Sequence, residues 1–299
     1  MKVTYLHHSG FLVELADRYL LFDWFEGQLP AFDGGKTLYV FASHVHGDHF
    51  SQKIFGLAPR QAAPHAAPQP SPPSGVFFIL SDDIPPRRVP PECKELTTFV
   101  KPRQTLEING MTVKTYRSTD EGVAFLIAVS HQLIFHAGDL NHWYWEGEPE
   151  DWLRRMTTDY HHELGLIAQD VMSFHRSISE KDRPLDIPPV PSGGTDAGFP
   201  PQVSPAGRAT APVPNGGADA AFLPLDPRLE DNFYLGIDDF MRTVGAKTVF
   251  PMHMWDDLAI IDRLKALPAA APYKDRIVPI HARGETFMTG SVMTGSVMT

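Results

Sequence analysis

Ser43-His44-Val45-His46-Gly47-Asp48-His49 is the stretch that decides the fold, because it gathers three histidines and an aspartate. Imidazole and carboxylate groups together suit zinc, manganese or iron. The preceding residues, 37–42 (Thr-Leu-Tyr-Val-Phe-Ala), predict a buried β-strand. The candidate ligands therefore follow the carboxyl end of a strand, where open sheets place their ligand sites. Gly47 is expected to allow the sharp turn that lets the side chains converge. The alternative is a His-rich surface turn, but such turns seldom follow a buried strand.

The composition describes an acidic chain with a substantial core. Its 299 residues, 42% of them hydrophobic, are enough for one large domain or two small ones. The formal net charge of −10 argues against broad binding of nucleic acid or anionic membranes. The single cysteine, Cys93, excludes an intrachain disulfide and fits a reducing compartment. No apolar run is long enough to span a bilayer, and residues 1–5 enter a strand pattern directly, so a soluble cytoplasmic protein is expected.

The remaining sequence predicts two halves in which strands are followed by helices. Asn109-Gly110 predicts a type I′ hairpin turn. The other predicted strands are 3–6, 11–15, 18–22, 76–80, 123–129, 132–135, 247–250, 276–280 and 285–288. The predicted helices are 50–57, 149–174, 236–244 and 255–267.

Two Pro-rich segments interrupt this pattern. Residues 58–74 and 188–219 lack periodicity and are interpreted as excursions from a single domain that covers residues 1–288. The second excursion would separate residues 185–187 from 220–224, which otherwise form one strand. Residues 289–299 continue a short Met-Thr-Gly-Ser-Val repeat and are predicted to be a disordered tail.

Several polar residues outside the His-rich stretch follow predicted strands. Asp23, Asp139 and His253 each come directly or shortly after an apolar strand. His142 follows Asp139 and is expected either to touch substrate or to be exposed. His161 is interpreted as a surface residue, because it and the adjacent His162 point in different directions on a helix.

The His-x-His-x-Asp-His pattern on its strand resembles the metallo-β-lactamase fold superfamily. His8-Ser9-Gly10 and Gly138-Asp139 resemble its ascorbate-6-phosphate-lactonase-like branch. The resemblance implies an α+β fold, a four-layer αββα sandwich with two mixed β-sheets packed face to face and helices outside. The metals would lie at one edge between the sheets.

The resemblance also implies two divalent metal ions, with zinc favoured and manganese or iron as alternatives. His44 and His46 would bind metal 1, and Asp139 would bridge the two metals. Asp48, His49 and His253 would bind metal 2, and Asp48 would also orient a metal-bridging hydroxide as a catalytic residue. Asp23 would brace the metal loop from behind. The further residues expected around the metals or in the substrate pocket are His8, His142 and Asp226.

The sequence departs from the superfamily at the third histidine of metal 1. The equivalent region, 116–122 (Tyr-Arg-Ser-Thr-Asp-Glu-Gly), holds no histidine, and Asp120 is the best substitute. A carboxylate in this position favours manganese or iron more than a three-histidine site does. If Asp120 does not reach metal 1, that metal is expected to bind weakly and the protein to be mononuclear or inactive.

These residues lead to two hypotheses from different classes. The first is a metal-dependent hydrolase of a small ester, lactone or phosphodiester, with a small-molecule substrate as its partner. The second is a non-hydrolytic metal-binding or diiron redox protein on the same fold, which the carboxylate-rich metal 1 site motivates. A scaffolding role for the Pro-rich segments is less favoured, because neither contains a repeated recognition motif.

Overall fold

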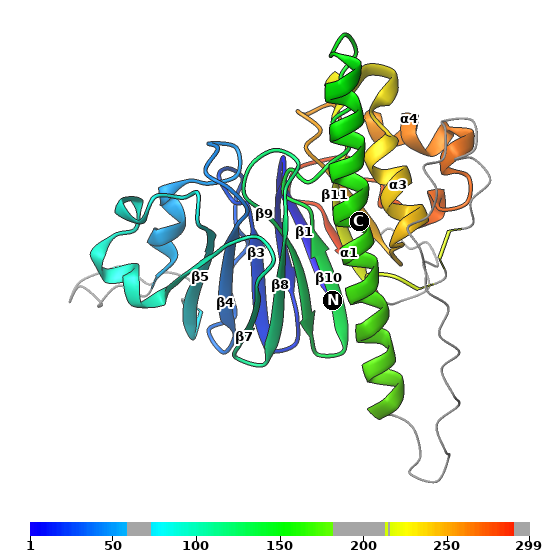
Figure 1. Cartoon of the computed structure of the whole chain (residues 1–299). Helices are drawn as coiled ribbons and strands as arrows, with labels where there is room; N and C mark the ends of the chain where they lie inside the picture. The colour runs from blue at the N-terminus through cyan, green and yellow to red at the C-terminus, as the bar shows by residue number, and fades with distance from the viewer. Residues whose placement is uncertain (59–72, 182–212, 215, 290–299) are drawn as a thin grey trace.

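The computed structural model describes residues 1–58, 73–181, 213–214 and 216–289, without the side chains of residues 178–181. Within them, two mixed β-sheets face each other and the longest helices lie beside one of them (Figure 1). The prediction of an α+β sandwich built on two mixed sheets is therefore confirmed. Most of both Pro-rich segments, the strand expected at 185–187 and nearly all of the repeat tail lie outside the described residues.

The first sheet has seven strands in the order β13-β1-β2-β3-β4-β5-β6. Strands β3, β4, β5 and β6 run parallel, whereas β13, β1, β2 and β3 pair antiparallel. The strands are β1 (Lys2–His7), β2 (Gly10–Glu14), β3 (Arg18–Phe22), β4 (Thr37–Ala42), β5 (Gly75–Ser81), β6 (Thr97–Val100) and β13 (Thr286–Met288). Because β3 and β4 are parallel neighbours, Asp23 and the His-rich loop emerge at the same edge.

The second sheet has six strands in the order β12-β11-β10-β9-β8-β7. The strands are β7 (Thr105–Ile108), β8 (Met111–Arg117), β9 (Val123–Val129), β10 (Gln132–His136), β11 (Ala220–Pro224) and β12 (Val249–Met252). Asn109 and Gly110 join β7 to β8 with φ values of 47° and 79°, as the predicted type I′ turn requires. Strands β10, β11 and β12 run parallel, so Asp139, Asp226 and His253 also reach one edge.

Alternating side chains of β4 show how the layers are held together. Tyr39 and Phe41 belong to the core between the sheets, where Phe41 packs against Phe125 of β9 with ring centroids 5.2 Å apart. Leu38 and Val40 belong to a second apolar cluster on the other face of the seven-stranded sheet. The strand before the His-rich loop is thus buried on both faces, as its continuous apolar sequence predicts.

The helices cover the two sheets differently. Helix α1 (Glu150–Lys181) lies beside α3 (Leu235–Thr243) over the six-stranded sheet (Figure 1). The short helix α4 (Ile260–Ala266) lies on the same side of the molecule in that view. The described outer layer over the seven-stranded sheet is instead made of 3-10 helices, with Ile54, Phe55 and Cys93 packed in its cluster. These helices are η1 (Gln52–Leu57), η2 (Pro86–Arg88) and η3 (Pro91–Leu96). The 3-10 helices η4 (Pro227–Asn232), η5 (Pro268–Ala270) and η6 (Lys274–Arg276) follow later in the chain.

Two predictions near the end of the chain are wrong. The helix expected at 255–267 begins only at Ile260, because Trp255 and Asp256 have φ values of 50° and 65°, which a right-handed helix cannot contain. Residues 276–280 form no strand; Ile277 makes a single bridge to Val249. Across the described residues, no helix combines the length and apolar composition needed to span a membrane.

Candidate metal centre

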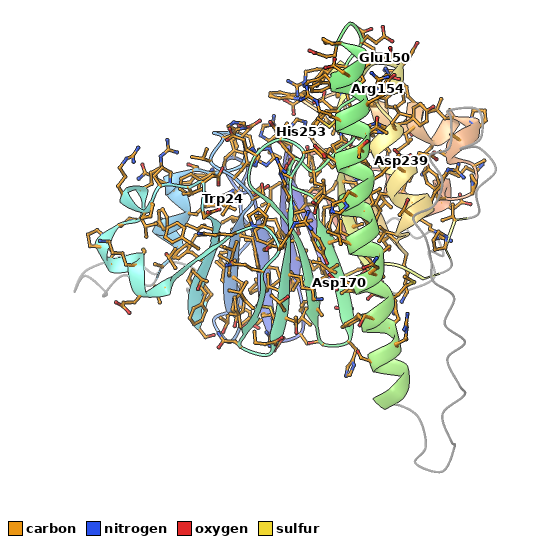
Figure 2. All side chains as sticks on the ribbon, viewed as in Figure 1. Trp24, Glu150, Arg154, Asp170, Asp239 and His253 are labelled. Atoms are coloured by element: carbon orange, nitrogen blue, oxygen red, sulfur yellow. The ribbon has the colours of Figure 1, made fainter. Side chains whose placement is uncertain are left out.

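The sheet edge described above brings the predicted metal ligands together in two groups. In each group the candidate donor atoms lie within 4.8 Å of one another. One group contains His8, Asp48, His49 and His253, and the other contains His44, His46 and Asp139. Figure 2 shows His253 at the upper end of the strands, well above Asp170 on α1. His8, which the sequence analysis placed only near the pocket, thus joins the predicted ligands of metal 2.

Asp139, a member of the second group, also faces two histidines of the first group. Its Oδ2 is 3.5 Å from Nε2 of His44, and its Oδ1 is 3.2 Å from Nε2 of His49 and 3.6 Å from Nε2 of His253. The side chain is buried. One carboxylate therefore faces histidines of both groups, which is the position that a metal-bridging ligand needs.

Three buried atoms in this cluster lack a hydrogen-bond partner among the described residues. They are Nε2 of His8, Nε2 of His49 and Oδ1 of Asp139. Leaving buried polar atoms unsatisfied costs about 1–3 kcal/mol each. Imidazole nitrogens and carboxylate oxygens are also the donors that zinc, manganese and iron prefer. The residues therefore fit divalent metal ions, which would satisfy all three atoms at once.

Asp23 supports the loop from below. It is fully buried, and its Oδ1 accepts a hydrogen bond from the backbone N–H of Ser43 at 2.8 Å. Its Oδ2 lies 2.7 Å from the hydroxyl of Ser43 and 2.8 Å from Nδ1 of His49. A proton on Nδ1 leaves Nε2 of His49 as the ring's metal-binding atom. These contacts are the ones expected of a brace behind the metal loop.

Asp226 orients His253 in the same way. Its buried Oδ2 lies 3.0 Å from Nδ1 of His253, whose Nε2 then faces Asp139. Desolvation raises the pKa of Asp226, but its hydrogen bonds to His253 and Arg228 hold the pKa well below the usual range. Each sheet therefore supplies one histidine held by a buried carboxylate.

The charges of the histidines differ when no metal is bound. Burial lowers the pKa of His44 to about 4, and the neighbouring His49 adds to the effect. Burial likewise lowers the pKa of His8 to about 4. Burial also acts to lower the pKa of His49, but the carboxylates of Asp139 and Asp23 outweigh it and raise that pKa to about 9. His49 therefore carries the proton that a metal would displace.

Two neighbouring carboxylates, those of Asp120 and Glu121, lie near His46. Oε2 of Glu121 lies 3.4 Å from Nε2 of His46, and both side chains are exposed. Asp120 is absent from the donor group of His44, His46 and Asp139. Desolvation and the Asp139 carboxylate raise the pKa of Asp120, so the two acids lie within electrostatic reach. Sequence reasoning passed over Glu121, although it stands next to Asp120 in the same turn.

Glycines support the centre at positions other than the expected one. Gly138 has φ 53°, and a Cβ there would lie 2.7 Å from Cβ of Ser43. Gly122 has φ 70°, and its Cβ would lie 2.0 Å from the Ser43 carbonyl oxygen. Gly47 has no positive φ, and nothing lies within 4 Å of its virtual Cβ. The role expected for Gly47 is therefore wrong; the glycines are needed where the second sheet approaches the root of the loop.

His142 and His161 differ from their expected surroundings. His142 is buried rather than exposed; its Nδ1 lies 2.8 Å from Oδ2 of Asp239, and its Nε2 lies 2.8 Å from the hydroxyl of Thr157. Nε2 of His161 lies 3.0 Å from the same Asp239 oxygen, so His161 is not a free surface residue. Asp239 belongs to α3 and lies to the right of His253 in Figure 2. These contacts join α1 and α3 to the loop that follows β10.

The chain resembles several solved structures at low identity. No protein-family model and no curated protein matches the sequence. Igni18, a metallo hydrolase from Ignicoccus hospitalis, is 15% identical with a TM-score of 0.49, covering 97% of this chain and 99% of that one. YhfI from Bacillus subtilis, a metallo-β-lactamase fold protein, is 13% identical with a TM-score of 0.48, covering 96% and 99%. CmlA, a diiron β-hydroxylase from Streptomyces venezuelae, is 10% identical with a TM-score of 0.40, covering 85% and 44%.

The architecture itself decides the fold. Two mixed sheets face each other, the His-x-His-x-Asp-His loop follows β4, and further candidate ligands follow β10 and β12 at the same edge. This combination identifies the chain as a metallo-β-lactamase fold protein.

Proposed function

We propose that the protein is a metal-dependent hydrolase with two divalent metal ions, acting on a small ester, lactone or phosphodiester. The observation that carries the proposal is the position of Asp139, which faces His44 of one donor group and both His49 and His253 of the other. When bound, two metal ions would supply a water of lowered pKa and a Lewis acid for the attacked oxygen.

We assign to Asp48 the role of orienting the attacking water. Desolvation raises its pKa, but His8 and His49 outweigh this and hold the pKa well below its usual range. The carboxylate is therefore ionised at neutral pH and can accept a hydrogen bond from an attacking water. Its side chain is partly exposed, with Oδ2 3.4 Å from Nε2 of His8, so it lies between the buried histidines and solvent.

The test is metal content measured together with turnover. Protein purified without chelator and reconstituted with zinc, manganese or iron should hold about two metals per chain, as two donor groups would require. Lactones, aryl esters and phosphodiesters would then be assayed as substrate classes. His49→Ala should lose metal and activity, whereas the exposed His281→Ala, the matched control, should lose neither. A reconstituted parent that holds two metals and hydrolyses none of these classes would contradict the proposal.

A non-hydrolytic diiron centre is the second candidate, and the approach of Glu121 to His46 favours it. A carboxylate at this position would make the metal 1 ligands harder than a three-histidine set. Such a protein should prefer iron over zinc during reconstitution and should show an iron-dependent visible absorption. A colourless protein that is active with zinc would exclude this candidate.

A further inference from the structure

Arg228 lies one side chain away from the candidate metal centre. It follows Asp226 in η4, and its Nε lies 2.9 and 3.0 Å from the two carboxylate oxygens of Asp226. The same carboxylate holds Nδ1 of His253. The Asp226 ion pair and, further away, the carboxylates of Asp139 and Asp48 raise the pKa of Arg228. The guanidinium is therefore within electrostatic reach of the predicted ligands without being one of them.

Two tryptophans flank this guanidinium. Its central carbon lies 4.6 Å from the ring centroid of Trp255 and 5.5 Å from that of Trp145. Such cation–π contacts fix the plane and position of an arginine. Trp145 stacks on Trp143, which packs against His253 and donates its indole N–H to the Asp139 carbonyl oxygen. Trp143 and Trp145 thus connect the candidate metal centre to Arg228 through successive aromatic contacts.

This arrangement is open to solvent. The side chain of Arg228 is 49% exposed, and Trp255 is 47% exposed. Trp255 is held there in a left-handed conformation with φ 50°, which costs a β-carbon-bearing residue free energy. An exposed indole in a strained backbone, placed directly over a cation, is poorly explained by packing. A binding role accounts for both features.

The Asp226 ion pair leaves part of the guanidinium available. The hydrogen bonds to Asp226 use Nε and Nη2, and Nη1 has no hydrogen-bond partner within the part of the chain that the structure describes. A guanidinium carries five N–H donors, arranged to match the oxygens of a carboxylate or phosphate. Asp226 therefore fixes one edge of Arg228 and leaves the edge at Nη1 for a ligand.

We propose that Arg228, between Trp145 and Trp255, binds an anionic oxyacid group of the substrate, a carboxylate or a phosphate, away from the bond that is cleaved. The inference rests on the proposed hydrolase function, which it narrows to substrates that carry such a group. The neighbouring indoles provide apolar surface for the part of the substrate next to the anion.

Binding can be tested without turnover, because Trp145 and Trp255 contact Arg228 and their fluorescence should respond to a ligand bound there. Zinc-reconstituted protein would be titrated with 4-hydroxybenzoate, phenyl phosphate and benzamide, using tryptophan fluorescence and calorimetry. The first two probes distinguish a carboxylate from a phosphate, and benzamide is the neutral control. Arg228→Gln should weaken binding of at least one anion about tenfold or more and leave benzamide unchanged. Arg228→Lys should retain part of the affinity, because it keeps the charge but loses the planar fork.

Two controls separate anion binding from other roles of Arg228. Arg263→Gln removes another exposed arginine that stacks on an aromatic ring, 4.7 Å from Phe233, and should leave all three affinities unchanged. Metal content per chain would be measured for every variant. If Arg228→Gln loses metal in proportion to its loss of binding, the arginine acts only through Asp226 and the proposal is overturned. The proposal is also overturned if the parent binds neither anion more tightly than benzamide.

A turnover assay then separates this inference from the proposed function. The substrates would be 4-acetoxybenzoate, 4-acetoxyphenyl phosphate and the neutral 4-acetoxybenzamide. Arg228→Gln should raise KM for a charged ester about tenfold and leave the neutral ester unaffected. Anion binding that depends on Arg228, without hydrolysis of lactones, esters or phosphodiesters, would sustain the anion site and reject the hydrolase. If the esters are hydrolysed with a KM that changes neither with Arg228→Gln nor with the charge of the substrate, the hydrolase is supported and the anion site is rejected.

Discussion

Nδ1 of His49 lies 2.8 Å from a carboxylate oxygen of Asp23, and both side chains are buried. Asp23 directly follows β3, and His49 lies in the loop after the parallel neighbour β4. Asp23 also accepts a hydrogen bond from the backbone N–H of Ser43. One carboxylate therefore fixes both the start of the His-rich loop and the orientation of its last histidine.

Replacing Asp23 should therefore weaken metal binding without removing a ligand. Asp23→Asn keeps the size of the side chain and tolerates the φ of 43° at this position. We expect metal affinity to fall by about 10–100-fold, because the orientation of His49 is lost. Competition with a chromophoric chelator measures the affinity. Asp170→Asn, which affects an acid paired with Lys114 on the outside of the sheet, is the control and should bind metal like the parent. Equal affinity in both variants would show that Asp23 does not orient a ligand.

Asp120 and Glu121 are the two candidates for the third protein ligand of metal 1, in place of the missing histidine. We expect Asp120→Ala to lose about one metal per chain, and Glu121→Ala to retain both. The reason is that Asp120 interacts electrostatically with Asp139, His46 and His253, three predicted ligands of the centre. Glu121 is exposed and lies beside the exposed His46. Elemental analysis after reconstitution measures the difference. Loss of metal in Glu121→Ala alone would transfer the role to Glu121.

The metal-free protein should lose stability as the pH rises. The pKa of His49 is raised from 6.5 to about 9, since Asp139 and Asp23 outweigh the effect of burial. The folded state then holds this proton more tightly than the unfolded state. The resulting stability is complete below pH 6.5 and is lost as the pH rises through 9.

Urea denaturation of chelator-treated protein at several pH values between these limits checks the expectation. Zinc-loaded protein should not show this contribution, because the metal takes the place of the proton on His49. The same decline in a metal-free His49→Gln variant would assign the pH dependence to other groups.

Gly138→Ala and Gly47→Ala form a matched pair. A Cβ on Gly138 would lie 2.7 Å from Cβ of Ser43, and the residue has a positive φ, so we expect a loss of about 1–3 kcal/mol in unfolding free energy. The loop should shift and metal content should fall with it. A Cβ on Gly47 has no neighbouring atom within 4 Å, so the unfolding free energy of Gly47→Ala should stay within about 0.5 kcal/mol of that of the parent. Thermal unfolding and metal analysis measure both effects. A tolerated Gly138→Ala would mean that the two sheets can separate slightly at this point.

Local patterns were sufficient for much of the fold, and the His-rich stretch itself supplies four of the candidate donors that the structure brings together. A continuous apolar strand placed the His-rich loop at a sheet edge, and Asn109-Gly110 specified its hairpin. These features depend on residues that are close together in the sequence. Asp139 and His253 were located through the resemblance to the superfamily, because each follows a strand where the superfamily has a ligand.

The remaining contacts join distant parts of the chain, and no local pattern reports them. Asp239 lies 97 positions beyond His142 and 78 beyond His161, so nothing in the sequence around either histidine indicated a shared carboxylate. The expected helix at 255–267 failed for a similar reason. Its first turn is held in a left-handed conformation beside Arg228, a contact that the apolar spacing of the segment cannot reveal.

The backbone N–H of His253 donates to the carbonyl oxygen of His8 at 3.2 Å, and β13 pairs with β1. Both contacts join residues 2–8 to residues more than two hundred positions further along the chain. During synthesis the His-rich loop therefore leaves the ribosome some two hundred residues before His253, the last candidate ligand. A nascent chain of that length exposes several donors of an incomplete centre. Tight metal binding is thus delayed until β12 and His253 have left the ribosome, when the second sheet can close over the first.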